Sequence, residues 1–136
     1  NSRNFTIIMT IFTKIIQGEI PCHKIAESKD FLAFLDIAPL AKGHTLIIPK
    51  IEIDYIFDLH EDVLGDMMKF AKVVAKKIEK AVDCKRIGLA VIGLEVPHAH
   101  IHLVPINNVS DIDFSRPKLA ISPNELEQIA TTITQG

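Results

Sequence analysis

Three histidines stand at alternate positions within residues 98–104, separated by small or apolar residues. This alternation has the period of a β-strand, so His98, His100 and His102 are expected on one face of the strand. Three of the six histidines of the chain therefore lie within residues 98–102. Such a row of imidazoles can hold a metal ion, bind a phosphate group, or present one ring as a nucleophile beside hydrogen-bond donors.

The type of chemistry depends on how the rings are spaced. Packing does not require three polar rings on one face of a strand, so a purely structural role for the three histidines is the least expected of the alternatives. Three imidazoles suit Zn²⁺, but same-face positions on a strand lie ~7 Å apart while the ligands must converge at ~2.1 Å. Zinc is therefore possible but not expected. Phosphate chemistry needs no metal, because a neutral imidazole can attack phosphorus while its neighbours donate hydrogen bonds.

Length and composition predict one globular domain over residues 9–136. The phosphate chemistry described above requires no cofactor. A net charge of -2 gives no reason to expect a nucleic acid or an anionic membrane as partner. The two cysteines, Cys22 and Cys84, lie far apart and suit a reducing compartment. No run reaches the ~20 apolar residues of a membrane span. We expect a cytoplasmic protein whose residues 1–8 form a disordered leader before Met9.

The elements that must position the histidines are predicted from periodicity and turn signals. Strands are expected at residues 24–28, 31–37, 44–49, 87–93 and 98–106. A long amphipathic helix is expected from His60 to Val82, and short helices at residues 10–17 and after Ser122. The predicted fold class is α+β, with a five-stranded antiparallel sheet, one long helix and short terminal helices.

The alternating histidines resemble the signature of the histidine triad family of nucleotide hydrolases and transferases. Two further blocks resemble that family in the expected order: Ile11–Pro21, and Phe34–Pro39 followed by Gly43–Lys50. The likeness extends from Ile11 to about Ile106 and is closest to the nucleoside phosphoramidase and dinucleoside polyphosphate hydrolase branches. It implies the same α+β fold and a homodimer whose two sheets join.

The resemblance also implies roles for individual residues. His100 is the expected nucleophile, which takes a nucleotidyl group onto its ring. His98 and His102 flank it, bind phosphate oxygens, supply the proton of the leaving group or orient His100, and His44 arrives near the phosphate from another strand. Asp36 is expected to accept both ribose hydroxyls, as a carboxylate can. An apolar slot for the base is expected from Phe12, Ile15 and Ile37, with Ile11, Phe34 and Leu35 as further candidates.

One segment departs from the family pattern. Many members carry an asparagine and a Gly-Gln-Ser/Thr run before the triad, whereas the loop here is the shorter Val91–Pro97, with apolar Val91 or Ile92 at the asparagine position. Loss of one oxyanion donor costs ~3 kcal/mol. The expected function is hydrolysis or transfer at the α-phosphorus of a purine nucleotide phosphoramidate, aminoacyl adenylate or dinucleoside polyphosphate. The alternatives are a nucleotide-binding regulatory module with little turnover and a zinc-binding protein.

Overall fold

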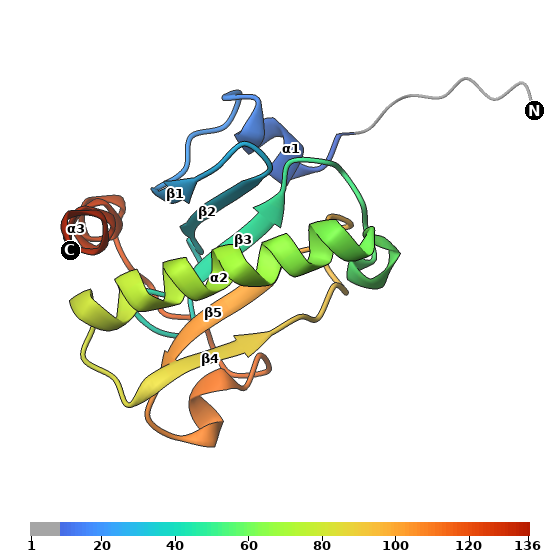
Figure 1. The fold of residues 1–136 in the computed structure, drawn as a ribbon. Helices are drawn as coiled ribbons and strands as arrows, with labels where there is room; N and C mark the ends of the chain where they lie inside the picture. Colours follow the sequence, from blue (N-terminus) through green and yellow to red (C-terminus); the bar gives the residue numbers. More distant parts are fainter. Residues whose placement is uncertain (1–8) are drawn as a thin grey trace, which may run out of the picture.

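A computed structural model describes residues 9–136, so the expected leader over residues 1–8 lies outside the described part. Five strands form one antiparallel sheet in the order β1-β2-β3-β5-β4 (Figure 1). The strands are β1 (Lys24–Glu27), β2 (Phe31–Leu35), β3 (Thr45–Pro49), β4 (Arg86–Ala90) and β5 (Ile101–Ile106). The α+β prediction with a five-stranded antiparallel sheet is confirmed.

Side chains cap the starts of all three α-helices among residues 9–136. The helices are α1 (Ile11–Ile16), α2 (Glu61–Ala81) and α3 (Pro123–Gln135), with the 3-10 turns η1 (Ile56–Asp58) and η2 (Val109–Ile112). Thr10, His60 and Ser122 each accept a backbone N–H from the first turn of α1, α2 and α3 respectively, which satisfies an otherwise unpaired donor. No helix among residues 9–136 is long and apolar enough to cross a membrane.

Different helices cover the two faces of the sheet, and the histidines lie on the face that α1 covers. Helix α2 runs across one face (Figure 1), where Ile101 and Leu103 of β5 join the main hydrophobic core. On the other face, Phe12 of α1 packs with a second apolar cluster that includes Phe34 and Leu46. Leu46 pairs directly with His102 across β3 and β5. The alternating histidines therefore belong to the α1 face of the sheet.

The predicted strand over residues 98–106 is wrong at its start, because β5 begins only at Ile101. Pairing with β3 stops there, since Pro49 at the end of β3 has no N–H to continue the ladder. The Ala99 N–H instead donates to the Ile53 carbonyl at 2.7 Å. Strand β4 correspondingly ends at Ala90 rather than residue 93, and Gly93 turns the chain away with a φ of 78°.

The loop that joins β2 to β3 brings two site residues together. Asp36 follows β2 and His44 precedes β3, and the Asp36 N–H donates to the His44 carbonyl at 2.9 Å. Gly43 makes this turn with a φ of 97°, and a Cβ there would lie 3.0 Å from Val82 and 3.3 Å from Pro105. The turn thus needs glycine both for its backbone conformation and for its close packing.

Candidate active site

A cavity of about 410 Å³ opens on the α1 face of the sheet, beside the histidines. Its lining comes from four separate parts of the chain: the β2–β3 loop, the loop before the triad, β5 with the residue before it, and the segment after η2. The lining residues are Asp36, Ala38, His44, Ile92, Gly93, Leu94, Glu95, His100, His102, Phe114 and Lys118. This size accommodates a small organic ligand of the nucleotide class.

His100 carries an unprotonated ring nitrogen toward this cavity. Its Nδ1 lies 2.7 Å from the His98 carbonyl oxygen, which can only accept, so Nδ1 holds the proton and donates it. In the neutral ring the lone pair then resides on Nε2. An edge-on contact with Phe12, at 5.1 Å between ring centroids, fixes the plane of the ring. The geometry is that of a poised nitrogen nucleophile.

His98 lies behind His100 and is fully buried, at 0% exposure. Its Nε2–H donates to the Pro49 carbonyl at 2.9 Å, and its Nδ1 accepts the Thr10 hydroxyl at 2.9 Å. Burial lowers the pKa of His98, which keeps the ring neutral. Both nitrogens are therefore occupied, and the structure does not bring this ring to the cavity to bind phosphate. Its position suits instead the orientation of His100 through its own carbonyl.

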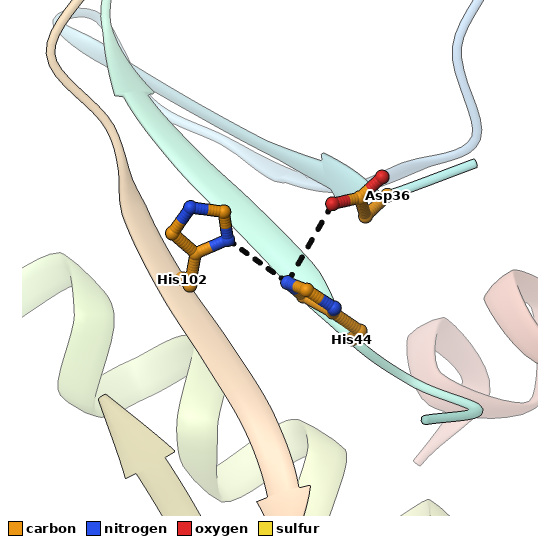
Figure 2. A group of neighbouring side chains, drawn as sticks. All are labelled: Asp36, His44 and His102. Atoms are coloured by element: carbon orange, nitrogen blue, oxygen red, sulfur yellow. Dashed lines mark hydrogen bonds and ion pairs between the residues drawn. The ribbon is translucent and has the colours of Figure 1, made fainter. Parts of the chain in front are cut away.

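His44 and His102 form a directed pair of imidazoles (Figure 2). The Leu40 N–H donates to His44 Nδ1 at 3.0 Å, so the proton of the neutral His44 ring is on Nε2. That Nε2 lies 2.9 Å from His102 Nδ1, which must accept. The proton of His102 is then on Nε2. A backbone amide thus sets the tautomers of two rings in sequence and leaves His102 with a donor for an oxyanion.

Both rings of this pair are held neutral. Burial lowers the pKa of His44 to about 4, helped by the charges of Lys118 and His100. Burial also lowers the pKa of His102 to about 3, with His44, His100 and Lys118 adding to the effect. At neutral pH the pair consequently acts through hydrogen bonds rather than through positive charge.

Asp36 stands at the edge of the same cluster. One carboxylate oxygen accepts the Ala38 N–H at 2.9 Å, while the other lies 3.6 Å from His44 Nε2 (Figure 2). Burial raises its pKa, and the bond from Ala38 offsets part of that increase. The second oxygen faces the cavity with capacity to accept further donors, as a pair of ribose hydroxyls would require.

The side chains of Asp36, His44 and His102 also offer ligand atoms within 4.8 Å of one another, as a metal site would. The hydrogen bonds do not fit this use. A neutral imidazole that binds a metal through Nε2 must carry its proton on Nδ1, where the Leu40 N–H already donates to His44. The arrangement in Figure 2 therefore matches a hydrogen-bond relay better than a metal site.

The apolar residues expected around a base are dispersed. Phe12 and Phe34 are buried in edge-to-face contact at 5.6 Å, and Ile15 packs against their cluster. Ile37 is 71% exposed and Ile11 also faces solvent. None of these five residues lines the cavity described above.

Leu35 is separated from that group by the alternation of β2. It is 2% exposed and belongs to the core beneath α2, on the face opposite Phe34. The expectation that both residues contribute to one slot is therefore wrong for Leu35, because neighbouring strand residues point to opposite faces.

Several residues of the site had no signal in the sequence. Phe114 packs against His102 at 4.6 Å between centroids, and Lys118 lines the cavity beside it. Both follow the last strand, in a stretch without periodicity or motif. Thr10 caps α1, and its hydroxyl also contacts His98, 88 residues away. Long-range contacts of this kind require the fold to be known.

The neutral histidines predict that acid destabilises the fold. The unfolded rings have a pKa near 6.5, and the folded values for His44 and His102 are about 4 and about 3. Below pH 6.5 the unfolded state binds more protons, so stability is complete above pH 6.5 and falls as the pH drops toward 4. Thermal unfolding should show Tm several degrees lower at pH 5 than at pH 7.5.

A pair of variants separates this effect from general acid denaturation. His44→Gln removes one of the buried titrating rings, so its Tm should depend less on pH between 7.5 and 5. His60→Ser removes an exposed histidine but keeps a helix cap, so its profile should match the parent profile. Equal slopes in all three proteins would contradict the assignment.

The chain is similar to known proteins along most of its length. The HIT domain model matches residues 17–109. The chain is 35% identical over 126 residues to adenosine 5'-monophosphoramidase hnt1 of Schizosaccharomyces pombe, which covers 91% of this chain and 95% of that protein.

Two solved structures are similar along nearly the whole chain. A Hit-like protein involved in cell-cycle regulation from Bartonella henselae superposes with a TM-score of 0.80 and 30% identity, covering 93% of this chain and 95% of that one. A Zn-bound histidine triad family protein from Mycobacterium smegmatis gives 0.78 and 26%, covering 92% and 90%. Because the family model matches more than half of the chain, the chain belongs to the HIT (histidine triad) family.

Proposed function

We propose that the protein hydrolyses or transfers a nucleotidyl group from a purine nucleotide derivative, with attack at the α-phosphorus by His100. The observation that carries the proposal is the bond from His100 Nδ1–H to the His98 carbonyl, which leaves the Nε2 lone pair at the cavity. The relative from Schizosaccharomyces pombe, named an adenosine 5'-monophosphoramidase, supports a substrate with a P–N bond.

The proposed reaction has two displacements. His100 Nε2 forms a bond to the α-phosphorus while the bond to the leaving group breaks, and that group departs protonated, with the proton drawn from solvent at the cavity mouth. Water then attacks the nucleotidyl-histidine and releases the nucleoside monophosphate. Throughout both steps His102 Nε2–H donates to a non-bridging oxygen, as an oxyanion donor does.

The short loop before the triad can take part through its backbone. Gly93, Leu94 and Glu95 line the cavity, and their N–H groups have no backbone acceptor within residues 9–136. Backbone N–H groups directed at a phosphate would replace the side-chain donors that the loop lacks. The same loop motivates the second candidate, a nucleotide-binding regulator with little turnover, because weaker oxyanion stabilisation would slow the reaction.

One experiment separates the three candidate functions. AMP release is measured from adenosine 5'-phosphoramidate and from a diadenosine polyphosphate, each with and without a chelator. Turnover that the chelator leaves unchanged supports the proposal. AMP binding without turnover would support the regulator, and turnover lost with the chelator would support a zinc-dependent protein.

Asp36 supplies a prediction on nucleotide binding. In Asp36→Asn the amide oxygen can still accept the Ala38 N–H, so the loop should keep its shape. The variant loses the charged acceptor for the ribose hydroxyls, so AMP should bind about tenfold more weakly by calorimetry. Asp83→Asn, an exposed change outside the cavity, is the matched control. Equal AMP affinities for Asp36→Asn and the parent would contradict the assignment.

We also propose a homodimer formed along β4. This strand is an edge of the sheet, and it exposes Leu89 (44%) next to its unpaired backbone groups. Leu89→Asp should shift the protein from dimer toward monomer in light scattering, since a buried charge opposes such an interface. Val109→Asp, at a similarly apolar but more exposed position, should leave the mass unchanged. A monomeric parent protein would refute this proposal.

A further inference from the structure

The segment after β5 lies outside the matched family domain yet closes one side of the active-site cavity. The family match ends at residue 109, whereas Phe114 and Lys118 line the cavity with the histidines. We call residues 110–119 the C-terminal strap. A part of the chain that the family model does not cover therefore lines the cavity, and this is where a property particular to this protein can reside.

The strap is tied down at both ends. Near its start, Asp111 accepts the N–H groups of Asn107 and Asn108 at 2.8 and 2.9 Å, and the Arg116 guanidinium donates to the Ser110 carbonyl at 2.6 Å. At its end, the Leu119 N–H donates to the carbonyl of Pro39, in the loop that carries Asp36 and His44. The strap is consequently fixed relative to the catalytic histidines.

Phe114 forms an apolar wall next to the oxyanion donor. Its ring is half-buried and lies edge-on to both His102 and His44, with centroid distances of 4.6 and 6.1 Å. This contact adds to the burial that keeps both imidazoles neutral.

Lys118 is held in place without being neutralised. Its ammonium donates to the carbonyls of Phe114 and Arg116 at 2.7 and 3.2 Å, and no carboxylate in residues 9–136 forms an ion pair with it. Carbonyl oxygens orient the group without neutralising it, and the ammonium has a third N–H to offer. Its charge also acts to lower the pKa of Asp36, without a direct ion pair. Its charge reaches the site, where it adds to burial in lowering the pKa of both His44 and His102.

Two carboxylates also line the cavity: Asp36, beside His44, and Glu95, from the loop before the triad. Both repel an anion, and among the lining residues Lys118 is the lysine that attracts it. We infer that Lys118 is a specificity-determining residue that recognises a second anionic group of the nucleotide, beyond the α-phosphate, and so favours such substrates over those with a neutral leaving group. This inference rests on the proposed function.

The test compares two substrates that differ in the charge of the leaving group. Adenosine 5'-phosphosulfate loses an anionic sulfate, whereas adenosine 5'-phosphoramidate loses a neutral amine. The ratio of their kcat/KM values should fall about tenfold in Lys118→Met, the size expected when one charge-assisted hydrogen bond is lost. Lys72→Met, on the exposed side of α2, should keep the parent ratio. An unchanged ratio in Lys118→Met would overturn the inference.

A binding experiment keeps the inference testable if the protein turns over neither substrate, an outcome that would count against the proposed function alone. Calorimetry compares AMP with ADP and with adenosine 3',5'-bisphosphate. ADP should bind more tightly than AMP, with its second anion on the leaving-group side, and this advantage should disappear in Lys118→Met. An advantage of the bisphosphate alone would place the second anion on the ribose and overturn the preference for a charged leaving group. Equal affinities of the parent protein for all three nucleotides would overturn the inference.

Discussion

Replacing His100 with asparagine is expected to lower kcat on adenosine 5'-phosphoramidate by at least about 1,000-fold, as removal of a nucleophile does. The asparagine amide can still donate to the His98 carbonyl, so the local hydrogen bond survives. What disappears is the ring nitrogen that attacks phosphorus. Steady-state release of AMP measures the effect.

The matched control is His60→Asn, an exposed histidine replaced by a residue that also caps helices. It should retain parent activity. The Tm and AMP affinity of His100→Asn should stay close to those of the parent, which would place its loss in the chemical step. If His100→Asn kept a tenth or more of the parent kcat, water would be attacking phosphorus directly and the covalent mechanism would be wrong.

The second large effect concerns the relay from Leu40 through His44 to His102. In His44→Phe the shape of a ring remains, but His102 Nδ1 loses the donor that sets its tautomer. The proton of His102 can then move to Nδ1, which removes the Nε2–H donor from the phosphate. We expect kcat to fall about 100-fold, the scale of losing one oxyanion donor, with a smaller change in KM.

A conservative variant distinguishes the relay from simple packing. His44→Gln retains an amide that can donate to His102, so it should recover part of the kcat lost in His44→Phe. His23→Phe, a partly buried histidine that pairs with Glu127 away from the cavity, should keep parent kinetics. Identical kcat for the Phe and Gln variants at position 44 would show that the tautomer of His102 is not what the residue controls.

The fold was predictable from the sequence because its signals are local. The long helix over residues 60–82 differs from α2 by one residue at each end, since its apolar stripe and acidic first turn are properties of that segment alone. The predicted alternation of side chains around His100 is also found in the structure, although the strand itself begins at Ile101. Side-chain alternation follows from an extended backbone, whereas the strand boundary depends on Pro49 in a different strand.

The site was predictable only where its residues carried a motif. His44, His100 and His102 line one cavity and His98 lies behind His100, and the family pattern was the reason to expect His44 beside the triad. Leu35 shows the limit of that reasoning. It was expected beside Phe34 because the two are neighbours in sequence, but it lies on the opposite face of β2. Phe114 and Lys118 show another limit. They reach the cavity because the chain returns after β5, and no local pattern encodes that return.

The central claim is that His100 becomes covalently bound to a nucleotidyl group during turnover. The direct measurement is mass spectrometry of the protein rapidly quenched under alkaline denaturing conditions during turnover of adenosine 5'-phosphoramidate, followed by peptide mapping. We expect an added adenylyl group on the peptide that contains His100, and none in His100→Asn. An active protein that carried no adenylyl group, or carried it equally in His100→Asn, would show that His100 is not the nucleophile.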